Sequence, residues 1–447
     1  MAETATQTQE TRAKARKTKK RRRHLKRLCV VLAVLVLAVG VCALINVIGD
    51  RGNLKYARSY APVAYEEQLK PEQDPFGYWC FTADRDFKVL QLTDVHIGGG
   101  FLSLGKDASA ITAVASMIAA EKPDLVIVTG DIAYPVPFQA GTFNNKVSAN
   151  IFANLMETLG VYWTLAFGNH DTEAYSYYTR EDISAFYSSG EFPHCLYQAG
   201  PEDVDGYGNQ IIKVKNSDDI ITQAFVVLDS HSYTNGDFLG IRWWYDNVHQ
   251  NQIDWYKTEI ARMNAENDAK LLLADPAKAA ELKDLSTVKS MLFFHIPLTE
   301  YKDAWEELAA NGYENTEDVK YITGIVGETG KAIYCGVGDD ELFETVQELG
   351  STKAIFCGHD HYNNFSVKYK GVDLVYGNSV DYLAYPGINK KGSQRGCTVI
   401  TTHTDGSYQI DKYNLYTSGR YDYPADFAND VAMQYEDVTY QYFKPEK

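Results

Sequence analysis

Residues 87–96 read FKVLQLTDVH, and residues 125–131 read LVIVTGD. Both are short apolar runs, rich in β-branched residues, that stop at polar residues, which is the pattern of a buried strand followed by a loop. A helical pattern covers residues 108–121 between them. A strand, a helix and a second strand in this order pair the two strands in parallel. The sequence therefore predicts an α/β fold whose globular part begins near Phe87.

The same alternation continues along the chain and extends the predicted sheet. Helical patterns occupy residues 147–159 and 252–267, and residues 268–290 resemble an amphipathic insertion to which we assign no chemical role. The alternation favours βαβ units and a mostly parallel sheet. Further strands are predicted at residues 162–167, 224–228, 291–294, 353–356, 372–376 and 398–401.

Five of the predicted strands end in residue types that bind metal ions. Side chains just past the carboxyl ends of strands converge on one crevice in an open α/β sheet, so we expect all five segments to meet there. Five of the ten histidines fall in these segments, which packing alone does not explain. The segments are QLTDVH (Asp94, His96), VTGD (Gly130, Asp131), AFGNHD (Asn169, His170, Asp171), FFHIP (His295) and FCGHDH (His359, His361).

Each segment alone has an ordinary structural interpretation, and only the set favours chemistry. An Asp-x-His or Gly-Asp pair at a strand end is common turn chemistry, whereas GNHD and GHDH are unusual without a function. The oxygen donors Asp94, Asp131 and Asn169, combined with imidazoles, suit Mn, Fe or Zn rather than calcium. The sequence has no clustered cysteines, which argues against a structural zinc site.

The ordered set D-x-H, GD, GNHD, H and GHxH resembles the calcineurin-like metallophosphoesterase superfamily, from about Phe87 to about Thr402. The text around the motifs, such as VLQLTDVHIG and FCGHDHYNNF, resembles the purple-acid-phosphatase-like branch. The resemblance implies two mixed β-sheets packed face to face and flanked by helices. It also implies two divalent or trivalent metal ions, one held by Asp94, His96 and His361, the other by Asn169, His295 and His359, with Asp131 bridging them.

The same resemblance implies a hydrolytic mechanism. Two close cations lower the pKa of a shared water, so that a metal-bound hydroxide can attack phosphorus at neutral pH. His170 is then the catalytic residue above the leaving group, and Asp171 could help to position the site. The segment GDIAY carries Tyr134 where purple acid phosphatases have an iron ligand, but they have glycine where His96 stands. We therefore expect Tyr134 to be a pocket aromatic that contacts substrate with Asn169 and His170, and we do not expect a purple colour.

The amino-terminal region predicts a membrane anchor. Residues 28–48 are uncharged and apolar, which is long enough for one transmembrane helix. Residues 1–27 carry eleven Lys and Arg against two Glu, so the positive-inside rule predicts a basic cytoplasmic tail, which we expect to be disordered, and an extracellular catalytic domain. The alternative is a signal peptide cleaved near Val41-Cys42-Ala43, which would give a secreted protein.

The remaining chain divides into a linker at residues 49–85, a metallophosphoesterase domain at 86–412 and a Tyr-rich carboxyl-terminal extension at 413–447. Since the chain has a net charge of −16 and the tail contributes +9, the rest carries −25. Such an acidic body repels nucleic acid, and small phosphate esters are the easier substrates.

These observations together predict a metal-dependent phosphoesterase, with phosphomonoesters as the first expectation. The same core would serve a phosphodiesterase or a nucleotide phosphohydrolase, and a non-catalytic surface binding module is a further alternative. Asp229 and His231 follow strand 224–228 and are expected to cap a turn rather than to line the pocket. Tyr382 or Tyr385, in the stretch 377–387, could form a pocket wall.

Overall fold

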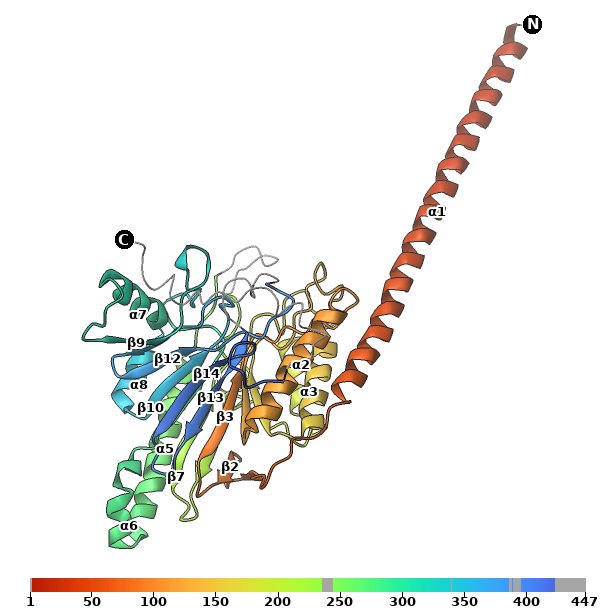
Figure 1. Ribbon diagram of the computed structural model, residues 1–447. Helices are drawn as coiled ribbons and strands as arrows, with labels where there is room; N and C mark the ends of the chain where they lie inside the picture. The colour runs from red at the N-terminus through yellow and green to blue at the C-terminus, as the bar shows by residue number, and fades with distance from the viewer. Residues whose placement is uncertain (1, 235–243, 339, 386–387, 389–394, 423–447) are drawn as a thin grey trace.

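The computed structural model describes residues 2–234, 244–338, 340–385, 388 and 395–422. Two mixed β-sheets lie face to face at its centre, with helices on both outer faces (Figure 1). This architecture confirms the expected fold class. Between the sheets lies an apolar layer to which both contribute, and in it the rings of Phe293 and Phe356 stack 4.7 Å apart.

The smaller sheet carries the first three motifs. Among the described residues it has five strands in the order β14-β13-β3-β4-β5. β3, β4 and β5 are parallel, as predicted, and β13 runs antiparallel to both β3 and β14. The strands are β3 (Phe87–Leu92), β4 (Leu125–Thr129), β5 (Trp163–Ala166), β13 (Gly396–Thr402) and β14 (Tyr408–Asn414).

The larger sheet carries the last two motifs. Its nine strands within the described residues follow the order β1-β2-β6-β7-β8-β10-β12-β11-β9. The strands are β1 (Glu72–Gln73), β2 (Trp79–Thr82), β6 (Gln210–Lys215), β7 (Ile221–Val227), β8 (Ser290–Phe293), β9 (Val319–Thr323), β10 (Thr352–Cys357), β11 (Ser366–Tyr369) and β12 (Val372–Tyr376).

The sheets are more mixed than the expected mostly parallel arrangement. The strands β7, β8, β10 and β12 are parallel neighbours, but β6 with β7 and β11 with β12 are antiparallel. Short connections explain the difference, because a tight turn can join only antiparallel strands, whereas a parallel pair needs a longer crossover. The parallel strands in both sheets still direct their carboxyl ends to one edge, where the motifs lie.

Helices cover the outer faces through apolar stripes. α2, α3 and α4 pack on the five-stranded sheet, and α5, α7 and α8 pack on the nine-stranded sheet. The predicted insertion at 268–290 forms the end of α5, α6 and a 3₁₀ turn, with a second such turn, η2, later in the chain. The helices are α2 (Leu104–Glu121), α3 (Asn145–Leu159), α4 (Arg180–Tyr187), α5 (Gln250–Leu273), α6 (Pro276–Glu281), η1 (Lys283–Ser286), α7 (Thr299–Ala310), η2 (Thr329–Lys331) and α8 (Leu342–Leu349).

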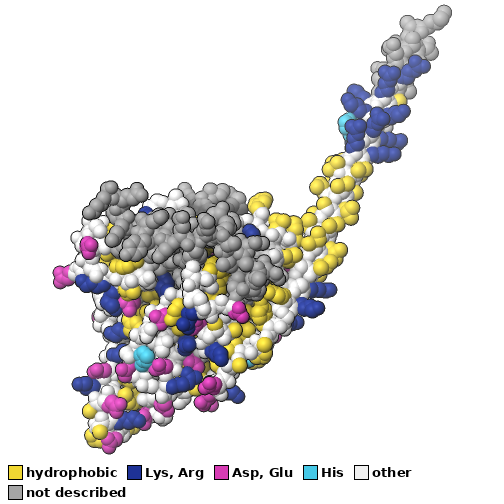
Figure 2. All heavy atoms as spheres, in the orientation of Figure 1, with side chains coloured by type: hydrophobic (Ala, Val, Ile, Leu, Met, Phe, Trp, Pro, Cys, Tyr) yellow, Lys and Arg dark blue, Asp and Glu magenta, His cyan; other side chains and the backbone are white. Residues whose placement is uncertain are grey.

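The amino-terminal region is a single long helix, α1 (Ala2–Ala57). Within the described residues it is the one helix long and apolar enough to cross a membrane, with an 18-residue window of mean hydropathy 3.3 that is not buried. Figure 2 shows hydrophobic side chains along its middle and Lys and Arg towards its start. The tail expected to be disordered is therefore helical here, since its Ala, Lys, Arg and Gln residues favour helix.

The segment expected as a linker, residues 49–85, is largely folded onto the domain. The last turns of α1 contact α2 and α3, and Ala57 is fully buried there. Farther along, β2 pairs in parallel with β6. The mixture of charged residues and prolines concealed these contacts in the sequence. At the other end, β14 runs through Asn414, and most of the Tyr-rich extension lies outside the described residues.

Candidate metal centre

The structure brings all five motifs to one buried place at the carboxyl ends of β3, β4, β5, β8 and β10. Every expected ligand side chain is buried, and His170 is partly exposed at the edge. The expected ligands are Asp94, His96, Asp131, Asn169, His295, His359 and His361. Segments up to 267 residues apart in the sequence therefore share one pocket, as the arrangement of parallel strands predicts.

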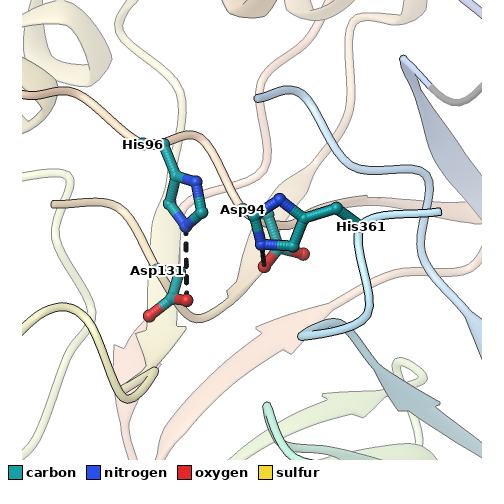
Figure 3. Close-up of side chains that lie close together, drawn as sticks. All are labelled: Asp94, His96, Asp131 and His361. Atoms are coloured by element: carbon teal, nitrogen blue, oxygen red, sulfur yellow. Dashed lines mark hydrogen bonds and ion pairs between the residues drawn. The ribbon is translucent and has the colours of Figure 1, made fainter. Parts of the chain in front are cut away.

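One group of side chains has the geometry of a metal site (Figure 3). One ligand atom from each of Asp94, His96, Asp131 and His361 lies within 4.8 Å of the others. Nε2 of His96 is 3.3 Å from Asp131 Oδ2, and Nε2 of His361 is 3.5 Å from Asp94 Oδ1. These four residues include the three that the family resemblance assigns to the first metal.

A second group lies on the other side of Asp131. Nε2 of His295 is 3.2 Å from Asp131 Oδ2 and 3.1 Å from Asn169 Oδ1. The ring of His359 is centred 5.1 Å from that of His295. Asp131 thus faces His96 and His295 with the same oxygen, which is the position required of a bridging ligand.

Asp381 orients two imidazoles of the first group. Its carboxylate accepts a hydrogen bond from Nδ1 of His361 at 3.0 Å and lies 3.3 Å from Nδ1 of His96. Both rings therefore direct Nε2 towards the pocket, which is the usual role of a carboxylate behind metal-binding histidines. Asp381 was not among the expected site residues, although it lies in the stretch 377–387 that we considered as a pocket wall.

Backbone groups orient the rest of the site. Nδ1 of His295 donates to the carbonyl oxygen of Thr129 at 2.8 Å, which leaves Nε2 for the pocket. The carboxylate of Asp171 accepts hydrogen bonds from the backbone N–H of Asp131, Ala133 and Gly168, at 2.8–3.0 Å. Asp171 therefore holds the loop that carries Asp131, the positioning role that its sequence position suggested.

The ligand loops adopt an unfavourable backbone conformation. Asp94, His96, Asp131 and His359 have positive φ angles of 50°, 52°, 55° and 78°. This left-handed region costs an L-residue about 1 kcal/mol or more, and such strain often concentrates at functional sites. A Cβ on Gly168 would lie 2.1 Å from Asp131 Oδ1, so the glycine of GNHD leaves room for the carboxylate of Asp131.

The charges in the pocket perturb its titration strongly. Burial lowers the pKa of His96, but Asp381 and Asp131 outweigh this effect and raise it to about 10. Burial also lowers the pKa of His295, which Asp131 raises to about 9. For His359, burial and then the neighbouring His295 hold the pKa well below its usual range, so that this ring stays neutral. Several nitrogens thus face carboxylates across distances that a metal ion can bridge, and the donor set fits two transition-metal ions.

His170 lies at the open side of the pocket. Its Nδ1 is 2.7 Å from Oε1 of Glu173, which also accepts a hydrogen bond from Tyr233 at 3.0 Å. The ring of Tyr134 lies 4.7 Å from His96 and 4.8 Å from His170, and its hydroxyl donates to Gln139. Tyr134 therefore lines the pocket with its ring, whereas Glu173 was missed because its spacing from GNHD matches no motif.

Asp229 and His231 lie outside the pocket. Asp229 accepts hydrogen bonds from the backbone N–H of Tyr207 and His231 and pairs with Arg180, as a turn-capping residue does. His231 belongs to a separate group with Asp246 and His249 whose ligand atoms are also close together. There, His231 bonds Gln252, and His249 pairs with Asp205 and Asp246, so ordinary hydrogen bonds explain the group.

The two tyrosines considered as pocket walls differ. The ring of Tyr385 lies 4.3 Å from His361 and is partly exposed, so it borders the pocket. The hydroxyl of Tyr382 bonds that of Tyr416, and Arg395 covers its ring, which places Tyr382 behind the pocket.

Residues 87–363 match the sequence model of the calcineurin-like phosphoesterases. The chain belongs to this family. Probable inactive purple acid phosphatase 29 of Arabidopsis thaliana is 26% identical over 339 residues, which cover 72% of this chain and 77% of that protein. Phosphatase DCR2 of Saccharomyces cerevisiae is 28% identical over 305 residues, 64% of this chain and 46% of that protein.

A solved dimetal phosphatase from Danio rerio is a more distant match. It shares 9% sequence identity with a TM-score of 0.45, and the match covers 74% of this chain and 96% of that one. The family match, together with the purple acid phosphatase relatives, confirms the resemblance inferred from the motifs.

Proposed function

We propose that this protein hydrolyses phosphate esters, and monoesters first, at a dinuclear metal site. The observation that carries the proposal is the convergence of the seven buried residues expected as ligands, with His170 at the pocket edge. Asp94, His96 and His361 would hold one ion, Asn169, His295 and His359 the other, and Asp131 would bridge them. When bound, two such ions neutralise phosphoryl oxygens and lower the pKa of a water between them.

The chain's own residues supply the acid and the orientation. Glu173 holds Nδ1 of His170, which leaves Nε2 to donate a proton to the departing oxygen. Asn169 contacts both His295 and the hydroxyl of Tyr233, so its amide is fixed beside the expected phosphate position. Tyr134 packs against the rings of His96 and His170 and closes one wall around the substrate.

The choice between substrate classes rests on a direct assay. Purified full-length protein, supplied in turn with Mn, Fe and Zn, would be given p-nitrophenyl phosphate and bis-p-nitrophenyl phosphate. We expect the monoester to be hydrolysed faster. Faster hydrolysis of the diester would favour the phosphodiesterase alternative, and a preference for nucleoside phosphates in a substrate panel would favour the nucleotide phosphohydrolase.

A non-catalytic binding module is the second candidate, and the name of the Arabidopsis relative, which includes "probable inactive", is the observation that favours it. This chain keeps all seven expected ligands and His170, which supports turnover instead. Metal analysis combined with the ester assay separates the two. Two bound ions without hydrolysis of any ester in the panel would support the binding module.

We also propose that α1 anchors the protein in a membrane, with the basic segment in the cytoplasm and the catalytic domain outside. The apolar middle of α1 and the Lys and Arg before it support this orientation. Protease treatment of intact cells tests it, because the catalytic domain should be degraded and residues 1–27 protected. Release of the protein by alkaline washing would indicate cleavage of the segment and a secreted form.

A further inference from the structure

The anchor helix makes specific polar contacts with two loops of the catalytic domain. Asn46 lies near the end of the predicted span at residues 28–48. Its Oδ1 accepts a hydrogen bond from the backbone N–H of Phe101 at 2.5 Å, and its Nδ2 donates to the carbonyl of Gly141 at 3.4 Å. With α1 spanning the membrane as proposed above, contact between a residue of the span and these loops would place both loops at the boundary of the bilayer.

Contacts farther along α1 fix its direction relative to the domain. Asn53 donates to Asp107 of α2 at 3.2 Å, and Asp107 in turn accepts from the backbone N–H groups of Gly98 and Gly99. The hydroxyl of Tyr56 bonds Thr112. The helix is therefore packed along the domain over several turns. If α1 spans the membrane, these contacts fix the distance of the loops beside Asn46 from the bilayer.

Both loops have the composition of a membrane-facing surface. Residues 97–105 and 132–145 contain no Asp, Glu, Lys or Arg, although the body of the protein is strongly acidic. They expose Leu102 to 50%, Phe138 to 92% and Phe143 to 38%. We call these three side chains the apolar rim. Hydrophobic side chains in Figure 2 continue from the helix onto the part of the domain beside it. Such a patch next to an apolar span is where contact with lipid is expected.

The same two loops adjoin the metal pocket along the chain. Residues 97–105 follow His96 directly, and residues 132–145 follow Asp131. Gln139, next to Phe138, accepts a hydrogen bond from the hydroxyl of Tyr134, the aromatic residue on the pocket wall. The ring of Phe143 lies 6.1 Å from that of Tyr175, two residues after Glu173. The apolar rim is therefore carried by loops that lead from the residues of the metal pocket, and Gln139 and Tyr175 connect it to Tyr134 and Glu173.

We propose that the apolar rim rests in the interfacial layer of the bilayer and that the substrate is a phosphate ester carried by a lipid of that bilayer. The proposal rests on the proposed phosphoesterase function and on the proposed membrane anchor, and it names the substrate class of the same site. A lipid whose chains remain in the membrane presents its phosphate at the height of the rim. Hydrolysis adds water across the phosphorus–oxygen bond, releasing inorganic phosphate to the aqueous side and leaving the lipid alcohol in the bilayer.

The first test compares phosphomonoesters in a bilayer with phosphomonoesters in solution. Full-length protein in phosphatidylcholine vesicles would be given dioleoyl phosphatidic acid or a polyprenyl monophosphate in the bilayer, and glycerol 3-phosphate or p-nitrophenyl phosphate in solution. We expect at least one lipid ester to be hydrolysed ten or more times faster than glycerol 3-phosphate, about the effect of a tenfold higher local concentration. Hydrolysis of the soluble esters alone would overturn the proposal, whereas hydrolysis of none would overturn the proposed function itself.

The second test removes the two most exposed side chains of the rim. We expect the double variant Leu102→Ser/Phe138→Ser to lower the lipid ester rate about fivefold or more and to keep the p-nitrophenyl phosphate rate within about twofold. The matched control is Leu272→Ser/Leu273→Ser, since both leucines are 86% exposed at the end of α5, beside α6 and far from α1 (Figure 1). A role of the rim would be contradicted if the double variant lost activity equally on both substrates, or if the control variant lost as much lipid ester activity.

A third measurement does not depend on activity. Brominated phosphatidylcholine should quench the added fluorescence of a Phe138→Trp variant and not that of a Leu272→Trp variant, because only the first residue contacts lipid. Equal quenching of the two would overturn the proposal. Mass spectrometry of the mature protein provides the remaining test, since an amino terminus beyond Asn46 would remove the contact on which the argument rests.

Discussion

The two halves of the metal pocket are held in different ways. In the first half, one side chain, Asp381, orients both His96 and His361 through their Nδ1 atoms. In the second half, the carbonyl oxygen of Thr129 orients His295. A side chain can be replaced and a backbone carbonyl cannot. The first half is therefore the one that a single substitution behind the ligands can weaken selectively, while Asp131 belongs to both halves.

The largest effect is expected where the halves meet. Asp131→Ala removes the oxygen that faces both His96 and His295, so both metal ions should be lost and ester hydrolysis should fall to background. Metal analysis after dialysis, with a thermal melt to verify folding, measures this. Retention of two ions at full occupancy would show that Asp131 does not bridge the halves.

His170 lies outside both halves, and its removal should separate chemistry from metal binding. His170→Ala should leave the metal content unchanged and lower kcat by about 10²–10⁴-fold, because the proton donor to the leaving oxygen is gone. The loss should be smaller for p-nitrophenyl phosphate, whose leaving group needs little protonation. An unchanged kcat for an alkyl ester would exclude His170 from the mechanism.

Substitution of Asp381 tests the asymmetry itself. Asp381→Asn should lower the affinity for one of the two metal ions by about 10–100-fold, since only the first half loses its orienting carboxylate. The affinity for the other ion should stay nearly unchanged. A calorimetric metal titration should then show two separated steps. Asp373→Asn is the matched control, because Asp373 is a buried carboxylate that bonds Tyr408 away from the pocket. Equal weakening of both ions would refute the asymmetry.

Protons compete with the metal ions for the same nitrogens in both halves. The pKa values of His96 and His295 are raised to about 10 and about 9, so these rings carry protons at neutral pH until a metal ion displaces them. Metal affinity should therefore rise between pH 6 and pH 9, by up to about tenfold per pH unit for each proton released. Metal titrations at several pH values measure this slope, and a flat profile would contradict it.

The sequence predicted the pocket better than its surroundings, and the reason is physical. Each expected ligand follows a strongly apolar strand, so the position of Asp94 or His295 could be inferred from a local pattern and the direction of parallel strands. Asp381 and Glu173 act through contacts that only the folded chain creates, at positions without a motif. The positive φ of Asp94, His96 and Asp131 was equally invisible, because nothing local distinguishes a strained loop from an ordinary turn.

The overall architecture followed from the family resemblance more than from residue patterns. Periodicity alone predicted a mostly parallel sheet, since it detected β3, β4 and β10 but not short strands such as β11, whose four residues offer little alternation. The region 49–85 was predicted as a linker from its prolines and charges, and its strands β1 and β2, of two and four residues, are too short to show a pattern. Short strands such as these lie next to or at the edges of the sheet and are recognised only once the strands that they pair with are known.

The packing of α1 against α2 and α3 has a practical consequence for preparing a soluble form of this protein. Removing everything before β2 would delete Tyr56 and Ala57 and uncover the apolar surface of α2 and α3 that they protect. Uncovered apolar surface promotes aggregation. A chain that begins at Asp50 would lack the apolar span but keep the last two turns of α1, which cover that surface. This is the boundary to choose for crystallisation.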